Sequence, residues 1–101
     1  MVQVVLCNCD PDEASALARR LVEEEVAACV NIIDGVQSIY RWEGELCVDK
    51  EATLLIKTSS ERYPALEAAI EEHHSYDVPE IIALEAKEVA DGYARWVDEQ
   101  L

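Results

Sequence analysis

The sequence predicts an α+β domain of the ferredoxin-like, split β-α-β type, with the element order βαββαβ, one antiparallel sheet and an additional C-terminal helix. Two segments with a helical apolar period alternate with runs rich in β-branched residues, and a long hairpin lies between the two halves. The chain has 101 residues, 50% of them hydrophobic, so residues 1–101 are expected to form a single domain.

The N-terminal half starts with a strand and a helix. The run Val2–Cys7 is apolar on both faces, which is typical of a strand in the middle of a sheet. Asp10 at the N-cap, Pro11 at the first helical position and Glu13 close to a capping-box position predict a helix start. The helix is expected to bury a stripe formed by Ala14, Leu17, Ala18, Leu21 and Val22.

The middle of the chain predicts one long, bent hairpin. Cys29–Ile33 and Val36–Trp42 are expected as strand on either side of a bulge at Asp34-Gly35. Glu43-Gly44 is expected to form the tight turn, and the return strand is predicted over Leu46–Val48 and Ala52–Lys57. Arms of about 13 residues would reach roughly 40 Å, against a usual strand of ~5–6 residues. The far half, which carries Tyr40 and Trp42, is therefore expected to be exposed unless another subunit covers it.

The second half repeats the strand and helix pattern. Ser59-Ser60 is expected to begin a helix with Pro64 in its first turn and with Tyr63, Leu66, Ile70 and His73 on one face. Ser75–Pro79 breaks that helix. Glu80–Ala86 is expected as a last strand with Ile81, Ile82 and Leu84 buried. Asp91-Gly92 then begins a terminal helix with Tyr93, Trp96 and Val97 on one side.

The charge balance narrows the classes of partner. Against 22 Asp and Glu stand 8 Lys and Arg, which gives a formal net charge of −14. Such a surface repels phosphate backbones and anionic lipid, so neither nucleic acid nor a membrane is expected as a partner, whereas cations are attracted. Without a bilayer-length apolar run or a signal-peptide pattern, we expect a soluble, cytoplasmic protein whose four cysteines are reduced.

Five stretches carry a resemblance to a known family. They are Ala27–Ile32, Ser38–Gly44 with its Tyr-Arg-Trp-Glu-Gly sequence, Leu55–Thr58, Tyr76–Leu84 with its Val-Pro-Glu-Ile sequence, and Tyr93–Val97. In this order the chain resembles the CutA family of divalent-cation tolerance proteins over essentially its whole length.

The resemblance implies an assembly and a function. CutA proteins are similar in build to the P-II signalling proteins, and they are homotrimers in which the long hairpins complete sheets between subunits. We therefore expect a homotrimer formed through the hairpin region of Tyr40 and Trp42. The bacterial members are linked to tolerance of copper and other divalent metals, and no enzymatic reaction is established for the family, so we expect a metal-binding protein and not an enzyme.

The resemblance also implies a copper site of one cysteine and two histidines. At the matching positions stand Cys7, His73 and His74. Ser75 replaces the proline that follows the histidine pair in the family, and one residue is inserted before the first helix, which makes Cys9 a candidate substitute ligand. Thiolate and imidazole donors suit copper and, as the alternative, zinc.

Other interpretations of the same residues stay open. Cys7 and His73 also fit buried core positions, and Tyr40 and Trp42 fit subunit packing better than a ligand cage. Adjacent helical residues point about 100° apart, so His73 and His74 can share an ion only if the helix ends there or if several subunits contribute. A P-II-like signalling or scaffolding module that binds a small ligand or partner protein between subunits is the alternative function. A Cys7 nucleophile with a His74 base is a third interpretation.

Overall fold

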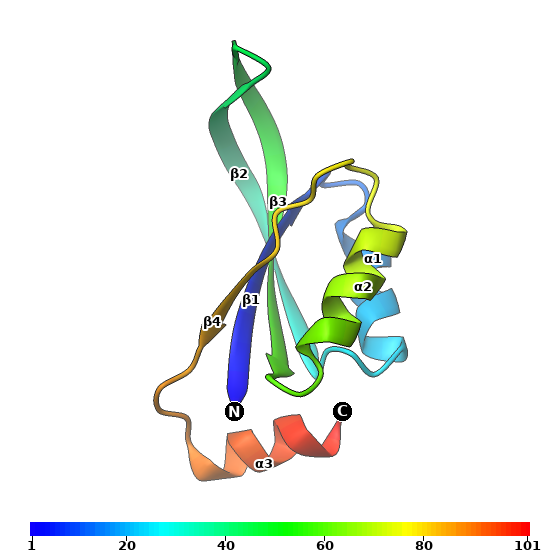
Figure 1. The fold of residues 1–101 in the computed structure, drawn as a ribbon, viewed down its shortest axis with the longest axis vertical. Coiled ribbons are helices and arrows are strands. Elements are labelled where there is room, and N and C mark those ends of the chain that lie inside the picture. Colours follow the sequence, from blue (N-terminus) through cyan, green and yellow to red (C-terminus); the bar gives the residue numbers. More distant parts are fainter.

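The computed structural model describes all 101 residues and has the predicted element order (Figure 1). Helices α1 and α2 lie side by side, and the short α3 crosses one end of the sheet, near both termini. The elements are β1 (Val2–Cys9), α1 (Ala14–Glu23), β2 (Cys29–Trp42), β3 (Glu45–Ser59), α2 (Tyr63–His73), β4 (Ile82–Glu85) and α3 (Asp91–Glu99).

The four strands form one antiparallel sheet in the order β2-β3-β1-β4. β1 is hydrogen-bonded on both sides, with Val5 opposite Ile56 of β3 and opposite Ala83 of β4. This confirms the central position that its apolar character predicted, because a central strand has no solvent-exposed edge.

Both long helices cover the same face of the sheet. Leu17 and Leu21 of α1 and Leu66 and Ile70 of α2 belong to one buried cluster with side chains of β1 and β3, among them Val5, Cys7, Cys9, Ala52, Leu54 and Ile56. Fully burying one such large aliphatic side chain contributes about 1.5–3 kcal/mol. Of the five residues predicted for the buried stripe of α1, Val22 is the exception, because it is 42% exposed at the edge of the stripe.

The first helix begins later than the sequence predicted. Asp10 does act as a cap, but its carboxylate accepts the Asp12 N–H at 2.8 Å and its carbonyl accepts the Glu13 N–H at 2.9 Å. These bonds close a turn before the helix, and Glu13 makes no capping hydrogen bond, so the regular helix starts at Ala14. The capping residue Asp10 therefore shows where the turn before the helix lies, and the regular helix begins a few residues later.

The start of α2 shows the same shift. The Ser59 hydroxyl accepts the Arg62 N–H at 3.2 Å and closes a turn, so the helix begins at Tyr63 instead of at the serine pair. Pro64 lies in the first helical turn, as predicted. Its missing N–H costs no hydrogen bond there, because the N–H groups of the first turn have no partner within the helix.

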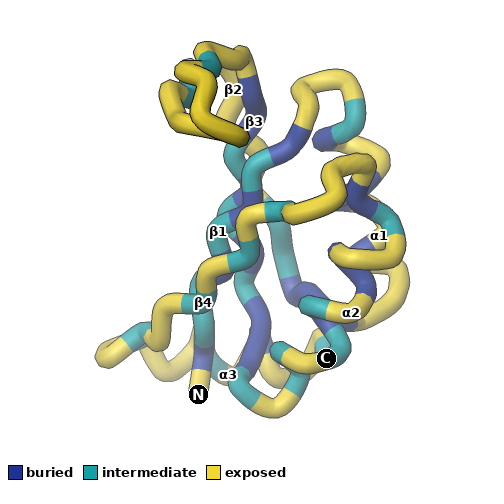
Figure 2. The backbone as a smooth tube through the Cα atoms, turned by 45° about the horizontal axis from the view of Figure 1, so that its top comes forward, coloured by how far each residue is buried: buried dark blue, intermediate teal, exposed yellow.

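The hairpin is longer than predicted, with 14 residues in β2 and 15 in β3. A bulge lies between Ile33 and Val36, where Gly35 has a φ of +73°. At the tip Glu43 and Gly44 have φ values of +49° and +83°, as a type I′ turn requires. The tip projects well beyond the helices and is exposed, in a molecule of 44 × 25 × 22 Å (Figures 1 and 2).

The last strand differs from its prediction in length and in burial. β4 has only four residues, and Ile82 and Leu84, both predicted to be buried, are 48% and 53% exposed. The reason is the register: Ile82 lies opposite Leu6, whose side chain faces away from the helices, because the neighbouring Val5 faces the core. Ile81 and Ala83 are the residues of this segment that pack partly against the core.

The helix α3 closes one end of the sheet. Val97 is fully buried against Val2 and Ala28 in a second small cluster. The other two residues of the predicted face, Tyr93 and Trp96, are each 40% exposed, and their rings stack at 5.7 Å. No helix of the chain combines the length and the apolar character that crossing a membrane requires.

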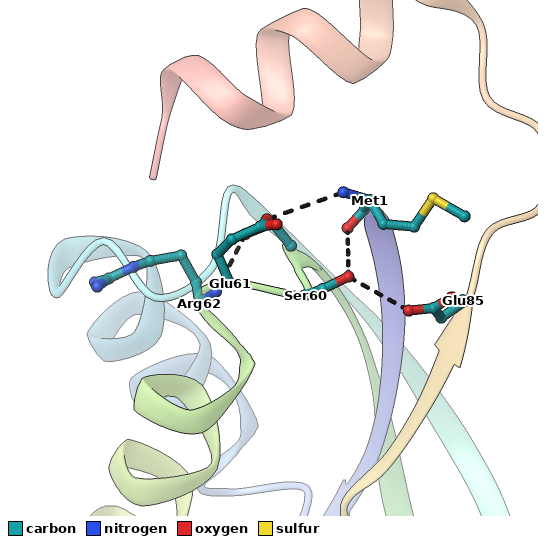
Figure 3. A network of polar contacts seen from close by, with 6 residues as sticks. Met1, Ser60, Glu61, Arg62 and Glu85 are labelled. Carbon is teal, nitrogen blue, oxygen red and sulfur yellow. Dashed lines mark hydrogen bonds and ion pairs between the residues drawn. The ribbon is translucent and has the colours of Figure 1, made fainter.

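A polar network holds the N-terminus at the same end of the sheet (Figure 3). The carbonyl of Met1 accepts the backbone N–H of Ser60 at 3.0 Å and its hydroxyl at 3.2 Å. The same hydroxyl lies 3.4 Å from Oε1 of Glu85 in β4, and the terminal ammonium lies 3.9 Å from Glu61. The connection between β3 and α2 is therefore fixed to both β1 and β4.

Candidate functional site

The two adjacent histidines lie where α2 ends. His73 is the last helical residue, and His74 is extended, with φ −78° and ψ 141°. The imidazoles therefore reach different partners: His73 Nε2 lies 3.0 Å from Glu24 Oε2 at the end of α1, and His74 Nε2 lies 2.8 Å from the carbonyl oxygen of Asn8 in β1. The helix ends as the copper hypothesis required, but the two rings diverge.

Both ring nitrogens of His74 have hydrogen-bond partners. Because Asn8 offers a carbonyl oxygen, Nε2 donates, and Nδ1 then accepts the Tyr76 N–H at 3.1 Å. The ring also packs on the Tyr76 ring at 4.6 Å and is only 9% exposed. These contacts fix the segment after α2 to the end of β1 and describe a neutral imidazole.

Cys7 lies on the helix-covered face of β1 and is fully buried. The pKa of the Cys7 thiol is raised to about 12, first by burial and then by the nearby Cys9, Glu80 and Glu51. Cys9 is also fully buried, and its pKa is raised to about 11, first by burial and then by Glu13, Glu51 and Asp10. Neither thiol is a ready thiolate at neutral pH.

The three predicted copper ligands have the right chemistry but are not gathered into a formed site. His74 reaches the strand that carries Cys7, whereas His73 turns to α1. Within one chain no three His, Cys, Asp or Glu side chains are arranged so that they could hold a metal ion. The side-chain types of these three residues thus suit a soft metal, but in the isolated chain they do not lie close enough together to form a metal site.

Thiol reactivity is expected to divide the four cysteines into two classes. Cys7 and Cys9 are buried with raised pKa values, whereas Cys29 and Cys47 are partly exposed. A thiol reagent at neutral pH is therefore expected to label at most two of the four thiols rapidly in the native protein, and all four after unfolding. Rapid labelling of Cys7 in the native state, located by peptide mapping, would contradict this placement.

A cleft that the sequence analysis did not anticipate lies between the hairpin and the segment that leads to β4. It has a volume of about 680 Å³, and the Tyr76 hydroxyl crosses it to donate to Glu51 Oε2 at 2.8 Å. The cleft is lined by Asn8, Ser38, Ile39, Tyr40, Trp42, Asp49, Glu51, Tyr76, Asp77, Val78 and Glu80. The alternation of Ser38, Tyr40 and Trp42 along β2 was the one signal of it in the sequence.

Two phenols of the cleft are hydrogen-bonded to carboxylates. Tyr40 donates to Asp49, and this hydrogen bond raises the pKa of Tyr40 to about 12. Burial and the bond to Glu51 raise the pKa of Tyr76 as well. Both phenols therefore stay protonated at neutral pH and orient the two carboxylates toward the cleft.

Comparisons with known proteins agree on one family. The model of the family described as CutA1 divalent ion tolerance protein matches residues 3–100. A protein described as divalent-cation tolerance protein CutA from Thermus thermophilus is 45% identical over 100 residues, which cover 98% of this chain and 97% of the relative.

Solved structures give the same result. A structure described as the periplasmic divalent cation tolerance protein CutA from Archaeoglobus fulgidus is 31% identical, with a TM-score of 0.94 and coverage of 99% of this chain and 98% of the other. A structure described as the PII-like protein CutA from Nostoc sp. PCC 7120 is 36% identical, with a TM-score of 0.92 and coverage of 97% and 95%.

Proposed function

The chain belongs to the CutA1 family of divalent ion tolerance proteins, and we propose that it takes part in the tolerance of divalent metal ions by binding copper. The observation that carries the proposal is the match of the family model over residues 3–100, from β1 to α3. The net charge of −14 supports it, because such a surface raises the local concentration of cations.

We propose Cys7, His73 and His74 as the copper ligands, with zinc as the alternative metal. Two observations support this set: α2 ends at the histidine pair, and His74 lies against the residue that follows Cys7. A ligand role requires that Cys7 lose its proton and that His74 release the Tyr76 N–H from Nδ1. The inserted Cys9 is the substitute thiol on the same face of β1.

Metal selectivity tests the proposal. Equilibrium dialysis of the reduced protein under anaerobic conditions is expected to give saturable binding of copper and zinc but not of magnesium, because thiolate and imidazole prefer the softer ions. High salt screens the attraction of the acidic surface and removes the unspecific contribution. Equal binding of all three metals would contradict a selective site.

We further propose a homotrimer formed through the hairpin that carries Tyr40 and Trp42. The face of the hairpin opposite these two aromatic residues carries Ile39, Leu46 and Val48, which are 63%, 71% and 55% exposed in the isolated chain. An apolar ribbon of this kind on an edge strand is typical of a surface that another subunit covers.

A P-II-like signalling or scaffolding role is the second candidate. It is favoured by the cleft beside the hairpin and by the likeness to the Nostoc protein that is described as PII-like. A thermal-shift screen separates the two: a metabolite or partner protein that raises the melting temperature, while metal ions leave it unchanged, would favour the signalling role.

We propose no catalytic role, since the family is described by metal tolerance and the thiol of Cys7 is buried and protonated. For the compartment we propose the cytoplasm. The relative from Archaeoglobus is described as periplasmic, so cell fractionation decides the location: recovery of the protein in a periplasmic extract would contradict the proposal.

A further inference from the structure

The far half of the hairpin has two different faces. Side chains alternate along each strand, and directly opposite residues share a face. Ser38 lies opposite Asp49 and Ile39 opposite Val48, so Tyr40, Trp42 and Asp49 share one face, whereas Ile39, Leu46 and Val48 share the other with Gln37, Arg41 and Lys50. A subunit contact on the aliphatic face leaves Tyr40 and Trp42 on the cleft face, which differs from the subunit packing that the sequence favoured for them.

Three aromatic rings line the cleft from two directions. Tyr40 and Trp42 come from β2, and Tyr76 comes from the segment after α2, where its hydroxyl bond to Glu51 holds it against the hairpin. These rings are between 38% and 50% exposed. The volume of about 680 Å³ is in the range of pockets that take small organic molecules.

The charges of the cleft all have the same sign. Asp49, Glu51, Asp77 and Glu80 line it, and no Lys, Arg or His does. None of the ion pairs of the chain involves these four carboxylates. Glu51 is only 7% exposed and has no cationic partner, although a buried carboxylate is costly unless a positive charge compensates it.

A cation would supply the missing charge, and the walls of the cleft indicate its kind. The carboxylates do not converge as metal ligands, and the cleft is far larger than a bare ion. Hard metal ions prefer oxygen ligands and water to aromatic faces, whereas aromatic faces attract organic ammonium groups through their quadrupoles. We propose that this cleft binds a small organic ammonium ion, held over Tyr40, Trp42 and Tyr76 and neutralised by the surrounding carboxylates. This function is separate from metal tolerance and does not rest on it.

The two tryptophans of the chain provide the test. Trp42 lines the cleft, whereas Trp96 lies on α3 at the other end of the sheet. In the isotope-labelled protein, choline chloride is expected to shift the indole N–H resonance of Trp42 saturably and to leave that of Trp96 in place. Sodium chloride at equal ionic strength and the neutral carbon isostere of choline are expected to shift neither resonance.

Charge-matched variants locate the site. Asp77→Asn with Glu80→Gln removes two cleft charges that are exposed and make no side-chain hydrogen bond, and it is expected to weaken choline binding roughly fivefold or more. Asp98→Asn with Glu99→Gln removes the same charge from α3 and is expected to leave binding unchanged. An equal response to the neutral isostere, an equal effect of both double variants, or no response to choline would each overturn the proposal.

Discussion

Replacing Val48 by aspartate is expected to separate the proposed trimer into folded monomers. Val48 is 55% exposed in the isolated chain, so the substitution costs the fold of one subunit little. In the assembly each subunit would bury an added carboxylate, at a penalty of several kcal/mol per ion, which corresponds to a weakening of association by roughly a thousandfold. Sedimentation measures the change, from about three times 11.3 kDa to a single chain.

The matched control is the same substitution on α1, away from the far half of the hairpin. Val22 is 42% exposed on α1, and Val22→Asp is expected to leave the trimer intact. If Val48→Asp sedimented like the unchanged protein, the aliphatic face of the hairpin would not be the contact. A wild-type protein that sediments as a monomer would refute the assembly itself.

Zinc binding is expected to strengthen about tenfold per pH unit between about pH 7 and pH 9, if Cys7 is a ligand. Burial raises the pKa of Cys7 to about 12, so the thiol is protonated over this whole range and releases one proton for each ion bound. Affinity therefore rises with pH and does not level off below the raised pKa. A site made of imidazoles alone would level off, because ordinary histidines are already neutral above about pH 7.

Cysteine variants show which thiol causes the rise of zinc affinity with pH. In Cys7→Ser the rise is expected to disappear, and in Cys9→Ser it is expected to persist if Cys9 is not the substitute ligand. Calorimetry in buffers of different protonation enthalpy measures the released proton directly. A flat affinity in the unchanged protein over this range would remove Cys7 from the ligand set.

The fold could be predicted where local patterns decide it. The buried positions Leu17 and Leu21 of α1 and Leu66 and Ile70 of α2 follow from helical spacing, and the hairpin turn follows from Glu43-Gly44. The helix starts were predicted too early, since the capping side chains Asp10 and Ser59 close separate turns first. Those turns depend on the direction in which the chain continues after β1 and β3. The periodicity of apolar residues does not contain this information.

Features that depend on strand order could not be predicted in the same way. The exposure of Ile82 and Leu84 follows from the edge position of β4 and from its register with β1, and neither is contained in the apolar run itself. The cleft has the same origin, because it forms only when the register places Asp49 beside Ser38 and the segment with Tyr76 folds back against β3.

The histidine pair shows how much of the candidate site could be predicted from the sequence. Its position at the end of α2 follows from the sequence, because Ser75–Pro79 breaks the helix. The partners of the two rings do not: Glu24 caps the end of α1 and Asn8 belongs to β1, and each contact depends on how those elements pack. Composition and motif therefore predicted which residues to test, and the packing determines how far apart their side chains are held.

Copper titration of the reduced protein by calorimetry, under anaerobic conditions, tests the proposed function most directly. It is made on the unchanged chain, on Cys7→Ser and His74→Ala, and on Cys47→Ser as a control from the hairpin, outside the proposed ligand set. Saturable binding in the unchanged protein and the control, lost in the other two variants, is the predicted result. The same weak binding in all four proteins would contradict a copper site, since it would mean that the acidic surface alone attracts the ion.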